Sequence, residues 1–229
     1  MKNKTLIINY IVLGILFVFN IFASIYMVNS HDTKNIFNEN ILKVVEIKVS
    51  DNELTWGYAT GCFIDSNGTI LTNKHVAFNS LTNANYNTIQ VRLANIDEWI
   101  NAEVLKVSEN DDLAKIKINR QNTEYFTFES SVSNGETIYT IGNPNGFGLS
   151  FTDGVVSSNL RNVIYNELTI PSIQTSFVIN EGNSGGPVFN KHGKLVGLIS
   201  FRLKDKNEDV IQGVSFAIPI NIISNFLKD

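Results

Sequence analysis

The chain has 229 residues, of which 43% are hydrophobic and 17% are charged, and its formal net charge is −4. This length suits one large domain or two small ones, and the composition is that of a globular protein with a buried core rather than a disordered chain. Acidic and basic residues are mixed along the sequence, so no basic stripe is available for phosphates and we expect no nucleic-acid partner. Because Cys62 is the only cysteine, neither an internal disulfide nor a thiolate metal site is expected.

An apolar segment occupies residues 6–28 and is preceded by two lysines. Its length is that of a transmembrane helix, and the basic flank favours a cytoplasmic N-terminus with the rest of the chain outside the cytoplasm. We therefore predict a single membrane anchor within residues 1–30, followed by a polar tether over 31–40. The alternative is a cleaved signal peptide, with a weak cleavage site at residues 28–30, which makes the protein secreted. A buried core helix is disfavoured by the all-round hydrophobicity and terminal position of the segment.

From residue 41 onward, short β-type segments alternate with clusters of Asn, Gly, Asp and Ser, without the helical periodicity of an α/β fold. The first set of predicted strands is 42–49, 61–65, 69–72, 88–93, 103–107 and 113–118. The second set is 137–141, 154–158, 168–174, 187–189, 194–200 and 210–217. We predict an all-β domain over 41–229 with two six-stranded barrels, about 41–120 and about 134–218, and a terminal helix after Pro219.

The sharpest motif is Glu181-Gly182-Asn183-Ser184-Gly185-Gly186-Pro187, a serine flanked by glycines. Acyl transfer needs an exposed hydroxyl and backbone N–H groups that converge on the developing oxyanion. Glycines allow such a backbone. We predict Ser184 as the nucleophile and an oxyanion hole formed by Gly182, Asn183 and Ser184, with the N–H groups of Gly182 and Ser184 as donors. Taken alone, the motif also fits an ordinary hairpin turn.

Two further residues complete a possible triad. His75 stands at the end of the predicted strand 69–72 and the start of a loop, and Asp112 directly precedes the strand 113–118. Asp111 is the neighbouring candidate. Each residue is weak evidence alone, because a single histidine is more often structural and Asp-Leu is commonly a turn. The order His, Asp, Ser is nevertheless one of the few recurrent orders of a catalytic triad.

With these motifs, the chain resembles the HtrA/Deg family of trypsin-like proteases over about residues 57 to 221. The matching segments are 70–76 around His75, Asp112-Leu113-Ala114, 174–187 around Ser184, Gly142-Asn143-Pro144 with Gly146, the stretch 152–157, and Phe216-Ala217-Ile218-Pro219. The resemblance implies two perpendicular barrels, with His75 and Asp112 on the first and Ser184 on the second. It also implies a serine endopeptidase without a cofactor, acting on peptides or unfolded proteins in protein quality control, and a homo-oligomer.

The sequence departs from the family pattern at several points. Family members usually carry PDZ modules after the protease domain, and we expect none here because the chain ends at Asp229. Cys62 replaces a small residue or glycine, and Ser176, Phe177 and Val178 replace the usual acidic and alanine residues.

The residues before the nucleophile loop are expected to line the primary specificity pocket. They are Val178, Ile179 and Asn180, with Glu181 at the rim. No acidic residue is buried there, so we predict cleavage after small or medium aliphatic residues, since a cation in an apolar slot is costly. The alternative is that Val178 and Ile179 are core residues.

The sequence is compatible with more than one mode of activation and more than one function. Asn183 stands where digestive enzymes carry an acid that pairs with a new N-terminus, so we expect activation by peptide or partner binding instead. A rival function is a catalytically silent peptide-binding module on the same fold. A glutamate-specific protease using His192 is a third reading, but the sequence around His192 is typical of a hairpin turn.

Overall fold

The computed structural model describes residues 10–22, 33–165, 168–207 and 209–228. It contains two compact units, residues 1–36 and residues 37–229. In the first unit, residues 10–22 are helical. Within the described ranges, no helix has the length and apolar character needed to cross a membrane. The anchor predicted over 6–28 extends into residues 1–9 and 23–32, which lie outside the described residues, so it stays a prediction.

Helix α2 (Thr33–Asn40) replaces most of the predicted polar tether. The apolar pair Ile36 and Phe37 interrupts the polar composition of this segment. Ile36 is buried, and the ring of Phe37 meets the ring of Phe151 edge-on at 5.7 Å between centroids. Burial of these side chains favours an ordered helix over an extended linker, which is why the tether prediction was wrong for residues 33–40.

The first sheet has the strand order β7-β6-β1-β2-β3-β9-β8. Its strands are β1 (Val44–Ser50), β2 (Gly57–Phe63), β3 (Thr69–Thr72), β6 (Thr88–Leu93), β7 (Ile100–Asn101), β8 (Glu103–Val107) and β9 (Ala114–Lys117). Three short elements accompany it: the 3-10 turn η1 (Ile41–Lys43), helix α3 (Lys74–Ala77), and the hairpin of β4 (Phe78–Asn79) and β5 (Ala84–Asn85). The hairpin occupies an asparagine-rich stretch between the predicted strands 69–72 and 88–93.

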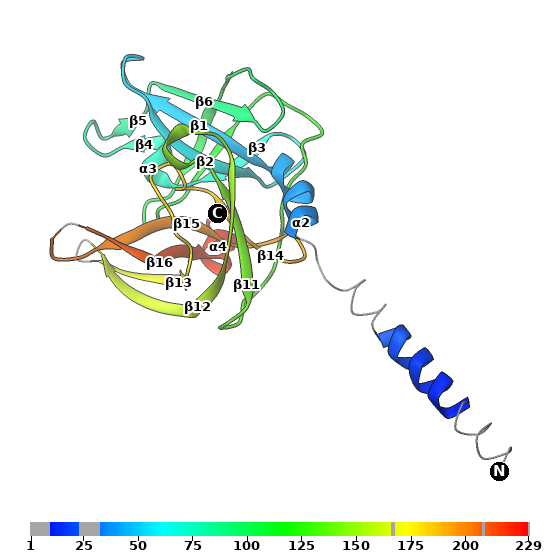
Figure 1. Ribbon diagram of the computed structural model, residues 1–229. Helices are drawn as coiled ribbons and strands as arrows, with labels where there is room; N and C mark the ends of the chain where they lie inside the picture. Colours follow the sequence, from blue (N-terminus) through cyan, green and yellow to red (C-terminus); the bar gives the residue numbers. More distant parts are fainter. Residues whose placement is uncertain (1–9, 23–32, 166–167, 208, 229) are drawn as a thin grey trace, which may run out of the picture. The chain divides into compact units, whose positions relative to one another are not determined.

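The second sheet has the order β10-β15-β14-β11-β12-β13-β16, and β15 also pairs with β16. Its strands are β10 (Thr127–Phe128), β11 (Thr137–Gly142), β12 (Ser150–Tyr165), β13 (Leu168–Thr175), β14 (Pro187–Asn190), β15 (Lys194–Lys204) and β16 (Val210–Pro219). The 3-10 turn η2 (Pro144–Gly146) follows β11. The predicted all-β architecture is therefore confirmed as two antiparallel-rich sheets, which lie one above the other in Figure 1.

Each sheet has its own apolar core. Residues of β1, β3 and β9 such as Ile47, Ile70 and Ile116 form the first cluster, and residues of β11, β14 and β15 such as Ile138, Val188 and Ile199 form the second. Cys62 in β2 is free and fully buried, and burial raises the pKa of its thiol. Burial of these apolar side chains stabilises the fold.

The terminal helix α4 (Ile220–Lys228) joins the two halves. Ile220, Ile223 and Phe226 are buried on one face, and the helix packs against β15 and β16. On its other side, Lys106 of β8 donates a hydrogen bond from Nζ to the carbonyl oxygen of Phe226 (2.9 Å). The predicted helix is confirmed, and it contacts both sheets.

Candidate active site

The predicted base and its carboxylate lie at one end of the first sheet. Strands β3 and β9 are antiparallel, with Thr72 opposite Ala114. Helix α3, which carries His75, begins just after β3, and Asp112 stands just before β9. Because the end of one antiparallel strand lies beside the start of the other, residues 37 positions apart in the sequence are brought into contact.

The imidazole of His75 is bound to both oxygens of the Asp112 carboxylate. Nδ1 lies 2.9 Å from Oδ2 and 3.0 Å from Oδ1, and the backbone N–H of His75 donates to Oδ1 (3.1 Å). A proton on Nδ1 satisfies this contact and leaves Nε2 as an acceptor. Desolvation lowers the pKa of His75, but the hydrogen bond and the negative charge of Asp112 outweigh it, so the pKa is raised above its ordinary value.

Ser200 is a third member of this network that the sequence did not indicate. Its hydroxyl donates to Oδ2 of Asp112 (2.7 Å), although the two residues come from different sheets. Ser200 lies in β15 at an irregularity in the pairing with β16, between Ile199 and Phe201. The only signal in the sequence is a single hydroxyl within an apolar strand, which gives no hint of its partner.

The nucleophile loop needs glycine for two steric reasons. Gly182 and Gly185 have φ angles of +93° and +81°, which side chains rarely adopt. A Cβ at Gly182 overlaps the carbonyl oxygen of Asn143, and one at Gly185 overlaps that of Thr60. The glycines therefore allow both the backbone conformation and the close approach of neighbouring chain, as the motif predicts.

Thr60 of β2 holds this loop against the first sheet. Its N–H donates to the carbonyl oxygen of Ser184 (2.9 Å), and its hydroxyl donates to the carbonyl oxygen of Gly182 (2.6 Å). The same hydroxyl accepts a hydrogen bond from the N–H of Asn143 (2.9 Å). The loop is fixed by contacts from both sheets.

The backbone N–H groups of the loop differ in their availability. The N–H of Asn183 donates to the carbonyl oxygen of Asn180 (3.1 Å). Those of Gly182 and Ser184 form no hydrogen bond with another described residue. Of the three residues predicted for the oxyanion hole, Gly182 and Ser184 are thus placed as possible donors, whereas Asn183 has its N–H committed within the loop.

Ser184 and His75 line one cavity of about 450 Å³, together with Gly182. No hydrogen bond joins the two side chains in the described structure, and the hydroxyl of Ser184 instead donates to the carbonyl oxygen of Ser200 over a long 3.4 Å. Catalytic hydrogen bonds are often long or poorly aligned without substrate. Rotation about one side-chain bond of Ser184 redirects its hydroxyl, since its present hydrogen bond is weak.

The residues predicted for the specificity pocket separate into different environments. Ile179 is only 6% exposed and belongs to the core of the second sheet, so it forms no open wall, whereas Val178 is 55% exposed. Asn180 and Glu181 are exposed. The alternative that both are core residues is therefore wrong for Val178, because adjacent residues face opposite ways in extended chain. The pocket formed by residues 178–181 stays a prediction.

Arg202 of β15 is a further residue that the sequence did not indicate. Nη1 donates to the carbonyl oxygen of Ile179 (2.9 Å) and to Oδ1 of Asn180 (3.3 Å). Nη2 lies 4.0 Å from Oε1 of Glu181. A cation therefore holds the segment before the nucleophile loop, and no local pattern indicates this contact because Arg202 lies 23 positions after Ile179.

Other predicted features of the site have simpler outcomes. His192 lies in the turn between β14 and β15, where its N–H donates to Oδ1 of Asn190 (3.0 Å), so the predicted hairpin turn is confirmed. Among the described residues, no group of three or more His, Cys, Asp or Glu side chains could hold a metal ion.

The fold and site are those of a trypsin-like peptidase. The family model described as "Trypsin-like peptidase domain" matches residues 59–198, and the chain belongs to this family. It is 37% identical over 174 residues to a "Probable periplasmic serine endoprotease DegP-like" of Pseudomonas putida, covering 74% of this chain and 34% of that protein. It is 30% identical to the "Serine endoprotease DegS" of Haemophilus influenzae, covering 85% of this chain and 56% of that one.

A solved structure gives the same assignment. "HtrA-type protease AlgW with tripeptide" superimposes with a TM-score of 0.75 at 27% identity, covering 86% of this chain and 62% of that chain. The resemblance to the HtrA/Deg group is therefore confirmed. The chain spans about a third of the length of the DegP-like relatives that it matches.

Proposed function

We propose that the chain is a serine endopeptidase that cleaves peptide bonds through Ser184, His75 and Asp112. The observation that supports the proposal is that His75, whose imidazole is bound to the Asp112 carboxylate, lines one cavity together with Ser184 and Gly182. No observation specifically favours a catalytically silent peptide-binding module.

In the proposed reaction, Ser184 Oγ forms a bond to the peptide carbonyl carbon while Nε2 of His75 takes the hydroxyl proton. The carbonyl oxygen becomes an oxyanion that accepts hydrogen bonds from the N–H groups of Gly182 and Ser184. The carbon–nitrogen bond then breaks, and the imidazolium gives its proton to the leaving amine. Water hydrolyses the acyl-enzyme by the same steps, with His75 again as base. Asp112 stabilises the imidazolium throughout.

The proposed substrates are peptides or unfolded proteins outside the cytoplasm. The DegP-like relative of Pseudomonas putida is described as a probable periplasmic endoprotease, which supports this compartment for the chain. Residues 6–28 remain our proposed single membrane anchor on the strength of their apolar composition and basic flank. Cleavage after small or medium aliphatic residues and assembly into a homo-oligomer also remain proposals.

Labelling with a fluorophosphonate tests both activity and location. The probe reacts with a serine that a base has activated, so we expect wild-type protein to be labelled and His75→Ala to be unlabelled. Labelled protein should be found in the membrane fraction. His192→Ala, which removes an imidazole from a distant turn, is the matched control and should label like wild type. Equal labelling of the two histidine variants would contradict the proposed base.

The pH dependence of hydrolysis tests the network around Asp112. His75 acts as a base only when neutral, so kcat/KM should rise as the pH passes upward through its raised pKa, which lies above 6.5. Ser200→Ala removes a donor that shares the charge of Asp112. The carboxylate then stabilises the imidazolium more strongly, and the acidic limb of the kcat/KM profile should move to higher pH. An unchanged limb, or one moved to lower pH, rules out this role for Ser200.

A further inference from the structure

The imidazole of His75 borders two separate cavities. One, of about 790 Å³, is also lined by Asp112 and Ser200. The other is the 450 Å³ cavity that contains Ser184, and three aromatic residues, Trp56, Tyr58 and Tyr86, line it. We call this second space the aromatic cleft. It provides apolar walls directly beside the reacting hydroxyl.

The direction of proton transfer indicates which part of the substrate enters the aromatic cleft. The leaving amine must receive its proton from His75. The same half of the molecule, built on the first sheet, carries both this imidazole and most walls of the cleft, including Gly57–Ala59 of β2 and Val76 of α3. The segment expected beside the acyl residue includes Ile179, which packs in the core of the second sheet and is bound by Arg202 of β15. The part of the substrate that follows the scissile bond therefore crosses the first-sheet side and enters the cleft.

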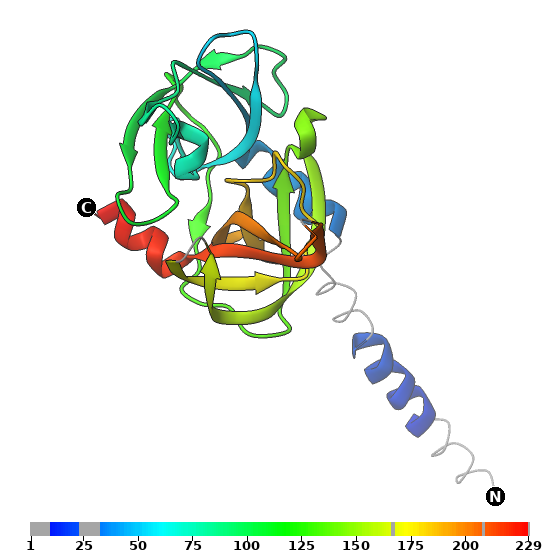
Figure 2. The same ribbon diagram turned by 90° about the vertical axis from the view of Figure 1, so that its left-hand side faces the viewer.

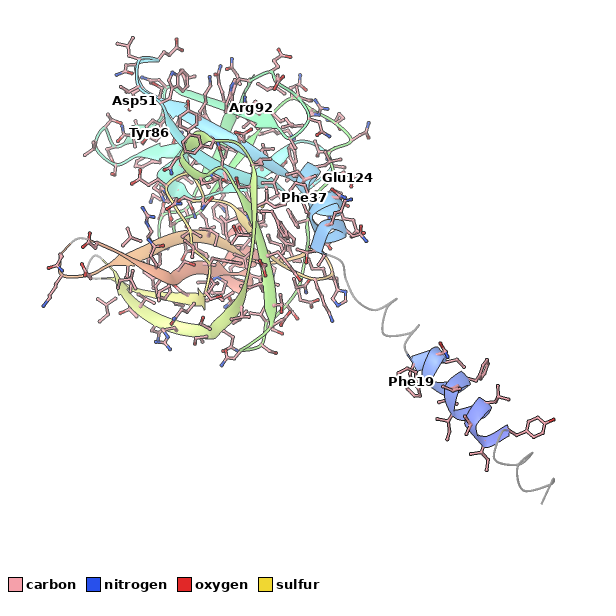
Figure 3. The ribbon with its side chains drawn as sticks, in the orientation of Figure 1. Phe19, Phe37, Asp51, Tyr86, Arg92 and Glu124 are labelled. Carbon is pink, nitrogen blue, oxygen red and sulfur yellow. The ribbon has the colours of Figure 1, made fainter. Side chains whose placement is uncertain are left out.

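The aromatic walls are held in place before any substrate binds. Lys48 lies with Nζ 4.3 Å from the ring centroid of Trp56 and 4.5 Å from that of Trp99, so one cation contacts both indoles. The ring of Tyr58 lies so close to Gly146 that a Cβ there would contact it. Tyr86 follows the β4–β5 hairpin, beside Asp51 (Figure 3), and its N–H donates to Ala77. A preformed wall lowers the entropic cost of binding.

The charges that line the cleft select among side chains. Besides His75 and the tyrosines, Glu181 is the titratable residue in the described lining, and its side chain is 89% exposed. A large apolar side chain entering the cleft buries its surface against the rings, whereas a carboxylate there loses water without gaining a partner, because Glu181 is itself an anion. We propose that the aromatic cleft is a subsite for a large apolar residue within the first two positions after the scissile bond. This inference rests on the proposed function and adds a specificity to it.

Matched peptides test the subsite. Internally quenched peptides share one sequence up to the scissile bond and carry Phe, Ala or Asp in the first two positions after it. Burial of a phenyl ring predicts that wild type cleaves the Phe peptide about tenfold faster in kcat/KM than the Ala peptide, with Asp slowest. An anilide substrate has no residue after the scissile bond and reports the acyl side alone.

The two tryptophans provide a matched pair of variants. Trp56→Ala and Trp99→Ala each remove one indole from Lys48, but only Trp56 lines the cleft. We expect Trp56→Ala to bring the ratio of kcat/KM for the Phe peptide to kcat/KM for the Ala peptide close to one. Its kcat/KM should fall far more for the Phe peptide than for the anilide, whereas Trp99→Ala should keep the wild-type ratio. If Trp56→Ala does not fold by circular dichroism, Tyr58→Ala takes its place. Tyr125→Ala is its control, since both tyrosines are 43% exposed and Tyr125 does not line the cleft.

Each outcome decides the proposal. A wild type that shows no preference after the scissile bond, or that prefers Lys or Arg there, overturns it. A Trp56→Ala variant whose kcat/KM falls by the same factor for the anilide and for every peptide also overturns it. Failure of the proposed function has a different signature, because no substrate is then hydrolysed and no fluorophosphonate label is incorporated.

Discussion

Replacing Ser184 with alanine is expected to lower kcat for peptide hydrolysis by about 10⁵- to 10⁶-fold, because no other group can form the acyl-enzyme. The variant should fold normally. The hydroxyl makes only one long hydrogen bond, and the loop is held by backbone contacts from Thr60. Thermal unfolding and steady-state hydrolysis of a quenched peptide measure the two effects.

A second serine serves as the control for this substitution. Ser66 lies in a turn beside an asparagine and near a glycine, as Ser184 does, and is exposed, but it does not line the cavity. Ser66→Ala should hydrolyse the peptide at the wild-type rate. Hydrolysis by Ser184→Ala that stays within tenfold of wild type would show that another residue is the nucleophile.

Replacing Asp112 with asparagine is expected to lower kcat by about 10⁴-fold. The carboxylate accepts hydrogen bonds from Nδ1 and the backbone N–H of His75 and from the hydroxyl of Ser200. An amide has one acceptor oxygen, and its NH₂ group favours the imidazole tautomer with an acceptor at Nδ1, which places the proton on Nε2. His75 then has no free nitrogen to take the proton of Ser184.

The neighbouring aspartate separates this effect from a general loss of negative charge. Asp111→Asn removes the same charge one residue earlier, and within the described residues no hydrogen bond or ion pair links the Asp111 carboxylate to His75. Its rate should stay within about twofold of wild type, since surface substitutions have small effects. If the two variants lose activity equally, the charge near His75 matters but the hydrogen bond does not.

The local parts of the fold and site could be predicted from the sequence. Strands such as β3, β6 and β8 were predicted to the residue, because their composition is β-type and turn residues bound them. The glycines around Ser184 were predicted because only glycine permits that backbone. His75 and Asp112 were predicted from their positions at the ends of strands and from the order of the triad.

The parts that depend on tertiary contacts could not be predicted. Ser200 meets Asp112 across 88 positions, and the register of two sheets decides that contact. Arg202 reaches Ile179 across 23 positions within the second half, and the folding of the chain between them decides that contact. Residues 33–40 read as a polar tether because the burial of Ile36 has no local signature. The short helix α3 was likewise missed, since a four-residue helix has almost no periodicity.

Because of the hydrogen bonds of Thr60, the conformation of the nucleophile loop depends on both halves of the domain. One side chain from β2 engages Gly182 and Asn143, which belong to the other half of the molecule. Either half on its own therefore lacks part of the contacts that hold the nucleophile loop. A change in how the halves pack reaches this loop through Thr60.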